Sequence, residues 1–478
     1  MKPINGKQFF HLGFQVEYSR INQFFFFEFN LPMFRKLLHF PSNSIAIVLH
    51  RLHSLFGCVY LKNSGQDVIA FLPEKYCIST SQQYETYTRS DFSNYQKDQN
   101  TNKFDHFFSF NPLSSSDSVE NFQGGYIGFI DYNYASAQHI DSATRTQPNF
   151  YMGEYQTFIH IENQQLVFCS LETCAEEFFT FVQNLLHTNQ APSTFKLNTL
   201  CQAMWTKQDY AQAFTQVQEY IKAGDCYQIN LTQEFSAKAQ GLLLDTAEHF
   251  WKLTDAPYSG YLKLDDFELL SCSPELFIDF KAERKIITKP IKGTMPRYDD
   301  PVLDQQSKDR LIHSQKDQAE NVMIVDLLRN DLSVYAETGS VKTPKLFNIE
   351  SFNQVHHMVS EVTATLKPEV NPFDVLLTAL PGGSITGAPK IRAMQIIEEL
   401  ECAPRGAYCG SLGYFNFDGT GSWNILIRSI QKYKNDISLW AGGGITIASD
   451  CDAEYQECFD KVSAMLDLLN TWYQPEDQ

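Results

Sequence analysis

Lys292 stands in the segment Pro290 to Thr294, with the sequence PIKGT, directly after an apolar run that is typical of a strand end. Pro290 fixes one backbone angle, and Gly293 lets the main chain approach a ligand closely. A lysine amine attacks as a nucleophile only when neutral, a state that partial burial or a nearby cation favours. A turn with a solvated lysine is the ordinary alternative, so these five residues alone leave the choice open.

A glycine-rich segment from Gly382 to Lys390 leads into an expected helix, with Pro389 in its first turn. The free N–H groups and the dipole of such a helix start attract anions. A phosphate loop would need Gly-Lys followed by Ser or Thr, and Ala388 and Pro389 break that pattern, so nucleotide binding is disfavoured. Carboxylate binding fits the same physics, and a helix start without a ligand remains the alternative.

Acidic residues near the end of the chain could hold a metal ion. Glu454, Glu457 and Lys461 are spaced by three and four residues, so they share one face of an expected helix. Neighbouring carboxylates suit Mg²⁺, which prefers oxygen ligands. Glu320 lies in another expected helix and could complete the site. A solvated helix face with a Glu457–Lys461 pair is the plain alternative.

Two further segments carry groups that could act on a substrate. His356 and His357 are adjacent in a strand-like run, so at most one of them faces a given pocket. Arg428 follows three aliphatic residues, where a guanidinium needs an anionic partner, either a protein carboxylate or a substrate carboxylate. The run Gly442-Gly443-Gly444 ends a strand and could supply further N–H donors.

The elements that must position these residues fall into two regions, 33–190 and 200–472. A polar linker separates them, and the strands of both regions could still belong to one sheet system. In the first region, apolar runs at 45–49 and 68–72 predict strands, and the polar segment 81–118 predicts a long mobile loop.

In the second region we expect a helix from Asp209 to Lys222, a helical block at 301–332 and a last helix at about 452–472. Strands and helices are interleaved without regular alternation, which indicates an α+β fold.

Composition limits the kinds of partner. The net charge of −18 argues against a surface for nucleic acid or for an anionic membrane, because both need clustered Lys and Arg. A small anionic substrate remains possible, since local cations can override the global field. The eleven cysteines show no zinc-like spacing and indicate reduced thiols, so we expect a cytoplasmic protein. No run approaches the ~20 apolar residues of a membrane span.

The first 32 residues are interpreted as a possible disordered N-terminal extension upstream of Met33. The apolar run from Phe24 to Phe27 is interrupted by Glu28, and no small-residue cleavage site follows it. We therefore expect no signal peptide.

Taken together, these segments resemble the chorismate-utilising enzymes. The family's PGGSITGAPK-type loop is present at 381–390, its KDxAEN helix at 316–321 and its EYQE-type helix at 454–457. The resemblance covers roughly residues 210–466, and several long motifs occur in the family's order. It implies an α+β fold in which two antiparallel β-sheets pack as a sandwich with helices outside.

Within that family, Lys292 and the segment Asp225 to Asn230 resemble the aminodeoxychorismate synthase branch, whereas anthranilate synthases typically carry alanine at the lysine position. The resemblance implies conversion of chorismate and ammonia to 4-amino-4-deoxychorismate, on the way to 4-aminobenzoate and folate. It implies Mg²⁺ as cofactor and Lys292 as a covalent nucleophile.

The resemblance also assigns roles to residues at matching motif positions. Beside Lys292, it implies Glu275 as the acid that assists loss of the ring hydroxyl and His357, not His356, as the catalytic histidine. The metal ligands it implies are Glu320, Glu457 and, close by, Glu454. The substrate contacts it implies are Ser384, Tyr408, Arg428, Gly442, Gly443 and Gly444.

The ammonia source is expected to be another protein. No Gly-x-Cys-x-Gly segment of a glutamine amidotransferase is present, so a separate amidotransferase subunit is implied. Related first regions can bind tryptophan, but a clear Leu-Leu-Glu-Ser signature is missing here, and tryptophan remains a possible ligand. The competing hypotheses are an anthranilate synthase component and a non-catalytic protein that senses amino acids on the same fold.

Overall fold

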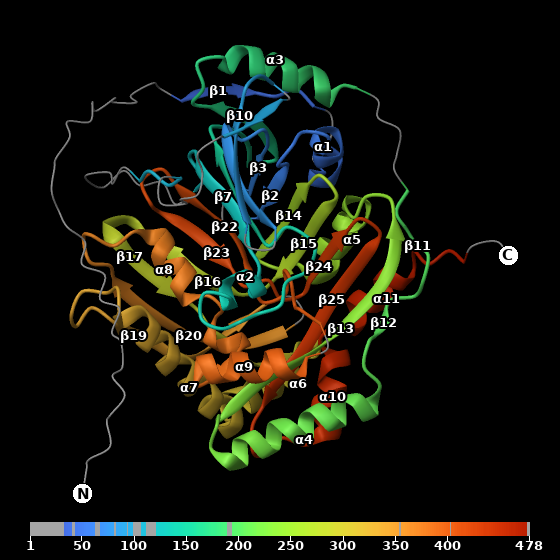
Figure 1. The fold of residues 1–478 in the computed structure, drawn as a ribbon, viewed down its shortest axis with the longest axis vertical. Helices are drawn as coiled ribbons and strands as arrows, with labels where there is room; N and C mark the ends of the chain where they lie inside the picture. The colour runs from blue at the N-terminus through green and yellow to red at the C-terminus, as the bar shows by residue number, and fades with distance from the viewer. Residues whose placement is uncertain are drawn as a thin grey trace, which may run out of the picture. The chain divides into compact units, whose positions relative to one another are not determined.

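The computed structural model describes most of the chain, and Figure 1 traces its course. The expected extension at 1–32 lies outside the described residues. Contacts join Met33–Gln478 into one compact unit. The described ranges are 33–40, 44–62, 67–80, 83–92, 94–98, 107–110, 121–188, 194–352, 355–401 and 403–475.

The first of two large antiparallel sheets has 13 strands within the described residues, in the order β1-β10-β9-β3-β2-β14-β15-β24-β25-β13-β11, with β12 and β21 also paired to β13. Its strands are β1 (Phe34–Leu37), β2 (Val59–Leu61), β3 (Asp67–Ala70), β9 (Thr157–Glu162), β10 (Gln165–Ser170), β11 (Lys196–Leu197), β12 (Gln202–Ala203), β13 (Gln228–Gln240), β14 (Tyr258–Leu264), β15 (Phe267–Ser273), β21 (Gly387–Ala388), β24 (Ser429–Tyr433) and β25 (Asp436–Ile445).

The second sheet has 12 strands in the described chain, in the order β18-β20-β17-β16-β23-β22-β7-β8-β4-β5-β6, with β19 paired to β20. Its strands are β4 (Lys75–Thr80), β5 (Gln83–Arg89), β6 (Tyr95–Lys97), β7 (Gly125–Ile130), β8 (Phe150–Tyr155), β16 (Leu276–Phe280), β17 (Lys285–Thr288), β18 (Ile291–Pro296), β19 (Lys342–Ser351), β20 (Val355–Thr365), β22 (Ser411–Asn416) and β23 (Gly421–Asn424).

Helices cover the outer faces of the sheets (Figure 1). They are α1 (Ile45–Leu52), α2 (Tyr132–Ser136), α3 (Ala175–Leu186), α4 (Lys207–Ala223), α5 (Leu244–Thr254), α6 (Pro301–Ile312), α7 (Gln315–Ser333), α8 (Pro372–Ala379), α9 (Lys390–Leu400), α10 (Cys451–Asp460) and α11 (Ser463–Asn470). In the described residues, no helix is both long and apolar enough to cross a membrane.

The two sheets pack against each other through apolar side chains. Leu262 and Leu269 of the first sheet share one buried cluster with Ile127, Phe129 and Leu412 of the second. Strands with both faces covered, such as β15 with the sequence FELLSCS, are buried along their whole length, including the polar residues Glu268, Ser271 and Ser273. The expected α+β class with two packed antiparallel sheets is confirmed.

In each sheet, strands of the first expected region form one block and strands of the second form another, and the two blocks are joined at one strand pair. In the first sheet, β2 pairs with β14, and in the second sheet β7 pairs with β22. Regions 33–190 and 200–472 therefore share their hydrogen-bonded sheets and their core.

Four local expectations are corrected. The run 45–49 forms helix α1, capped by Ser44, because Ala46, Val48 and Leu49 bury one helical face; a short apolar run does not distinguish a strand from a buried helix.

The expected loop at 81–118 contains β5 and β6, whose Tyr and Thr residues favour strands. The same segment buries Phe107 against Tyr126, with ring centroids 5.9 Å apart.

The last helix divides into α10 and α11, and the block 301–332 divides into α6 and α7, with Ser314 capping α7. The helix predicted from Asp209 to Lys222 is confirmed as α4. Thr206 is its cap, and Asp209 completes a capping box. The break before α7 lies at the Ser314 side-chain cap, whereas α11 begins after Val462 without a side-chain cap; a periodic pattern alone reveals neither break.

We predict that the shared core makes the two regions unfold together. Phe415 of β22 is fully buried and packs on Phe110 of the first region and on Trp423, with ring centroids 5.5 and 5.2 Å apart. Phe415→Ala should lower the free energy of unfolding by about 3–5 kcal/mol, measured by urea denaturation. Ile447→Ala, at a 59% exposed residue, should change it by less than about 0.5 kcal/mol. Destabilisation confined to one of two separate transitions would contradict the shared core.

Candidate active site

A cavity of about 800 Å³ brings together the predicted site residues. It lies where β13, β18, β20 and β25 meet α7, α10 and the glycine-rich segment before α9. Of the predicted residues, Gly443 is the one that does not line it. Those that do are Lys292, Glu275, His357, Ser384, Tyr408, Arg428, Gly442, Gly444, Glu320, Glu454 and Glu457.

An irregularity in β18 places Lys292 at the cavity. The register between β18 and β20 shifts between Ile291 and Thr294, and Gly293 has a φ of +89°, a conformation that glycine adopts at little cost. The Lys292 side chain is 16% exposed, and its Nζ lies 3.6 Å from Oε2 of Glu320. The bulge thus directs a largely buried amine at a carboxylate of α7.

Glu275 is a buried acid in the same cavity. Its backbone N–H donates to Oγ of Ser273 at 3.2 Å, and the Ser384 hydroxyl donates to its Oε1 at 3.4 Å. Burial raises the pKa of the Glu275 carboxyl to about 7, opposed by a hydrogen bond from Ile291 and by the charge of Lys292. Near neutral pH this carboxyl can therefore give up a proton to a bound group.

The two adjacent histidines have different surroundings. His357 lines the cavity, and its Nδ1 is 2.9 Å from the Thr294 hydroxyl. Burial, together with the positive charge of Arg428, lowers the pKa of His357 to about 4, so its imidazole is neutral at pH 7. His356 points to the other side of β20, where its Nε2 lies 3.1 Å from Asp304.

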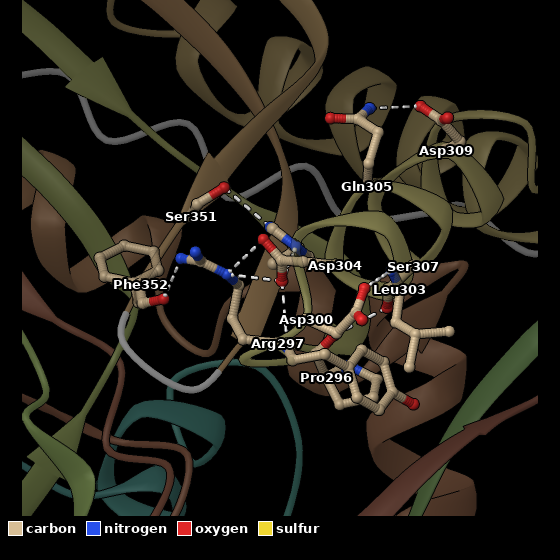
Figure 2. A network of polar contacts seen from close by, with 12 residues as sticks. Pro296, Arg297, Asp300, Leu303, Asp304, Gln305, Ser307, Asp309, Ser351 and Phe352 are labelled. Carbon is tan, nitrogen blue, oxygen red and sulfur yellow. Dashed lines mark hydrogen bonds and ion pairs between the residues drawn. The ribbon is translucent and has the colours of Figure 1, made fainter.

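Figure 2 shows the polar network around Asp304, which fixes the start of α6 beside β18 and β20. Arg297 donates through Nε to both Asp304 oxygens, at 2.8 and 3.0 Å, and through another nitrogen to the Phe352 carbonyl at 2.9 Å. Ser351 Oγ is 2.7 Å from Nδ1 of His356. His356 is thus part of the structural support of β20, on which His357 is carried.

Arg428 brings a positive charge to the cavity. Its backbone has a φ of +51°, and among the described residues no carboxylate forms an ion pair with its guanidinium. Burial lowers the pKa of Arg428, yet arginine stays charged in proteins. The sequence allowed either a protein carboxylate or a substrate carboxylate as the partner of Arg428. The described chain provides no such protein carboxylate.

The glycine run in β25 allows close packing around the cavity. A Cβ on Gly442 would lie 2.1 Å from the Leu231 carbonyl oxygen, and one on Gly444 would lie 3.4 Å from Nζ of Lys292. Gly443 faces α10, where a Cβ would come within 3.0 Å of Glu454 and 3.1 Å of Glu457. Gly443 therefore leaves room for the carboxylates and does not contact the cavity.

Three carboxylates at this end of the cavity are each close to a lysine. Beside Lys292–Glu320, Lys461 Nζ lies 2.6 Å from Glu457 and Lys316 Nζ lies 3.9 Å from Glu454. As they stand, no His, Cys, Asp or Glu side chains of the described chain form a group of three that could hold a metal ion.

One of these carboxylates carries an unpaired oxygen. Ser449 donates to Oε1 of Glu454 at 2.7 Å, whereas its Oε2 is buried without a hydrogen-bond partner. Burial raises the pKa of Glu454. Burial acts in the same direction on Glu457, but the ammonium of Lys461 outweighs it and lowers the pKa of Glu457. A buried, unpaired carboxylate oxygen beside further carboxylates is an environment that fits a hard cation.

Some cavity residues were not assigned from the sequence. Lys461, Lys316 and Asn230 lie within or beside the motifs noted above but received no role. Asn230 donates through its side chain to the Ile385 carbonyl at 3.1 Å. Trp440 also lines the cavity, and nothing in its apolar strand distinguishes it from an ordinary core aromatic.

Comparisons with known proteins agree on one family. Residues 57–467 match the chorismate binding enzymes. Aminodeoxychorismate synthase component 1 of Salmonella typhimurium is 42% identical over 353 residues, which span 73% of this chain and 77% of that protein. The Escherichia coli protein of the same name is 42% identical over 357 residues, with the same two shares. The crystal structure of anthranilate synthase component I from Streptococcus pneumoniae superposes with a TM-score of 0.71 at 25% identity, covering 84% of this chain and 92% of that one.

The raised pKa of Glu275 predicts a pH-dependent stability. Below the ordinary value of 4.5 the carboxyl is protonated in both the folded and the unfolded chain. Between 4.5 and about 7 the unfolded chain releases a proton that the folded protein keeps, so stability falls as pH rises. Glu275→Gln cannot release this proton and should not lose this stability. The free energy of unfolding of Glu275→Gln minus that of wild type should therefore rise by up to about 3 kcal/mol from pH 4.5 to above pH 7.

Urea denaturation between pH 4.5 and 8 measures this difference. Glu399→Gln, at an exposed residue of α9, is the control and should show the same pH profile as wild type. Parallel profiles for wild type and Glu275→Gln would show that Glu275 does not titrate near neutrality.

Proposed function

Because the chain belongs to the chorismate binding enzymes, we propose that it is the chorismate-aminating component of an aminodeoxychorismate synthase. It would convert chorismate and ammonia to 4-amino-4-deoxychorismate. The observation that carries the proposal is the Lys292 amine in the cavity, together with the buried acid Glu275. The relatives that are 42% identical over about three quarters of both chains support the same branch.

Chorismate carries two carboxylates, and the cavity offers positive charge for them. Arg428, which has no carboxylate partner in the described chain, would bind one carboxylate, with the Tyr408 hydroxyl and the main chain at Gly442 and Gly444 beside it. Ser384 would act through its hydrogen bond to Glu275. A local cation of this kind explains how a chain with a net charge of −18 can bind a dianion.

Mg²⁺ would be held by Glu320, Glu457 and Glu454, whose unpaired Oε2 fits such an ion. The ion supplies positive charge that neutralises the ring carboxylate and orients the ring.

The chemistry follows from the neighbouring groups. Hydroxide is a poor leaving group, so Glu275 donates its proton to the hydroxyl on ring carbon 4, which leaves as water. The Lys292 nitrogen forms a bond to carbon 2 as the C4–O bond breaks through the conjugated double bonds. Ammonia then bonds to carbon 4 and the C2–N bond breaks, which restores the lysine. Two easier steps replace one direct substitution.

His357 is proposed to assist proton transfer at the ring. Its imidazole is neutral, and the Thr294 hydroxyl engages Nδ1, which leaves Nε2 for the substrate or for a water molecule. Because its pKa is lowered, the imidazole is a weak base, so it would act through a hydrogen bond at Nε2 and not by taking the proton of the Lys292 ammonium.

Ammonia would come from a separate glutamine amidotransferase subunit, because the sequence contains no Gly-x-Cys-x-Gly nucleophile segment. The relatives are themselves called component 1. Anthranilate synthase activity is the second candidate, because the Streptococcus pneumoniae anthranilate synthase component I shares the fold at a TM-score of 0.71. Product analysis separates the two, because an anthranilate synthase would aminate ring carbon 2.

Replacing Lys292 tests the proposed function. Lys292→Ala should lower formation of the 4-amino product by about 10²-fold or more, the scale for loss of a positioned catalytic group. Residual amination should move toward carbon 2, which the lysine no longer blocks. Lys292→Arg should not restore activity, since guanidinium stays protonated. Incubation with chorismate and Mg²⁺ without ammonia should give an adduct that peptide mass spectrometry locates at Lys292.

Lys289→Ala is the matched control, because Lys289 lies directly before the segment Pro290 to Thr294 and pairs with Glu350 at 3.7 Å outside the cavity. It should leave the rate and the product unchanged. Near-normal 4-amination by Lys292→Ala would exclude the covalent role.

Replacing Glu457 tests the metal assignment. Glu457→Ala should abolish Mg²⁺-dependent turnover and weaken the binding of Mn²⁺, measured by electron paramagnetic resonance, while circular dichroism stays unchanged. Asp452→Asn on the same helix α10 is the control, because Asp452 is 73% exposed and pairs with Lys207. Unchanged Mn²⁺ affinity in Glu457→Ala would place the ion elsewhere.

A further inference from the structure

Two arginines and three aromatic rings form a continuous stack beside the cavity, which we call the cation–aromatic ladder. Arg145 lies over the Trp440 ring at 5.6 Å, and Trp440 is parallel to Tyr408, with centroids 6.0 Å apart and planes at 14°. Arg405 lies 5.8 Å from the Tyr408 ring and 4.6 Å from the Tyr132 ring. All four contacts lie within or at the range of favourable cation–ring and ring–ring interactions.

Each arginine of the ladder is fixed by a carboxylate and by main-chain carbonyls. Arg405 is buried, donates to both oxygens of Glu401 at 2.7 and 2.8 Å, and also donates to the carbonyls of Ile385 and Asn230 at 2.9 and 2.7 Å. Ile385 and Asn230 line the cavity. Arg405 therefore connects the glycine-rich segment, β13 and the Tyr408 ring.

Arg145 holds the other end of the ladder. It donates to Glu234 at 2.8 Å and to the carbonyl of Pro404, the neighbour of Arg405, at 2.6 Å. Arg145 and Tyr132 come from the first region of the chain, whereas Trp440 and Tyr408 come from the second. The first region thus supplies both outer members of the ladder.

Trp440 and Tyr408 are the ladder members that line the cavity. An aromatic ring between two such neighbours loses its freedom to rotate, because each face is covered. A buried Arg–Glu pair contributes little net stability, since the desolvation of both charges offsets their attraction. The Arg405–Glu401 pair is buried and the Arg145–Glu234 pair is partly buried, so both pairs are better explained by the positions that they impose than by the stability that they add.

We propose that Arg145 and Arg405 are positioning residues, which hold Tyr408 and Trp440 in place as the wall that receives the substrate. The inference rests on the proposed function, in which Tyr408 contacts a substrate carboxylate. Neither arginine touches the substrate. Loosening the wall weakens binding of the substrate and of the transition state alike, so KM should rise while kcat changes little.

Arg145 gives the cleaner test, because its side chain is 21% exposed whereas that of Arg405 is 1% exposed. Arg145→Gln removes the charge over Trp440 and the pair with Glu234. With ammonium as the nitrogen source, KM for chorismate should rise about 3- to 30-fold, the range expected for a partly desolvated cation–ring contact. The value of kcat should stay within about twofold. Arg145→Lys keeps the charge without the planar fork and should recover part of the loss.

Arg89→Gln is a closely matched control. Arg89 makes the same three kinds of contact at a distance from the cavity: an ion pair with Glu172, a hydrogen bond to the Leu72 carbonyl at 2.7 Å and a place over the Phe178 ring at 4.8 Å. Arg89→Gln should lower thermal stability at least as much as Arg145→Gln without changing KM. Near-ultraviolet circular dichroism should report altered ring packing in Arg145→Gln. The spectra of Trp440→Phe, with and without Arg145→Gln, identify the part of the signal that comes from Trp440.

An unchanged KM in Arg145→Gln, or an equal rise in Arg89→Gln, would overturn the positioning role. A fall in kcat with unchanged KM would also overturn it. Failure of the proposed function looks different, because wild type would then form no 4-amino product. In that case, calorimetric titration of wild type and the variants with chorismate still tests the ladder, and equal affinities would count against it.

Discussion

The candidate site depends on the close approach of β13, α10 and β18 around the run Gly442-Gly443-Gly444. A Cβ at Gly442 would overlap the β13 main chain, with an oxygen at 2.1 Å. A Cβ at Gly443 would come within 3.0 Å of Glu454. One at Gly444 would come within 2.7 Å of the Gln228 side chain of β13 and lie 3.4 Å from the Lys292 amine. Because these three positions carry no side chains, β13, α10 and β18 can pack closely around this part of β25. The cavity between them therefore contains residues from both the start and the end of the second region.

Within that boundary, charge is balanced by pairs. Lysines face the three carboxylates, burial favours the protonated form of Glu275, and His357 is neutral. Arg428 is left with positive charge that no carboxylate of the described chain neutralises. Because an uncompensated buried charge is costly, such a cavity favours an anionic substrate. The positive charge of Arg428 is a local feature of a chain whose net charge is −18.

The first region does more than extend the sheets. Its strands pair with those of the second region at β2–β14 and β7–β22, and its residues Tyr132 and Arg145 end the cation–aromatic ladder. The cavity wall formed by Tyr408 and Trp440 is thus supported from a part of the chain that carries none of the recognised motifs. This arrangement explains why the two regions form one compact unit around the site.

The sequence by itself determined the chemistry-bearing groups and the class of fold. Motifs such as PIKGT and EYQE are local, and spacing within one helix or strand specifies which side chains share a face. That reasoning placed Glu454 and Glu457 together and allowed only one of His356 and His357 to face a pocket. It could not identify the short apolar run at 45–49 as helix α1, because such a run fits either element.

Only the tertiary structure decided which distant groups meet. Lys292 reaches Glu320 because the register of β18 shifts at Gly293, and Gly443 faces the carboxylates because α10 packs on β25. The ladder from Arg145 to Tyr132 has no sequence signal, since its members come from separate elements. Periodicity indicates which residues of one helix or strand share a face. Contacts between elements depend on sheet register and side-chain packing, which cannot be read directly from the amino-acid sequence.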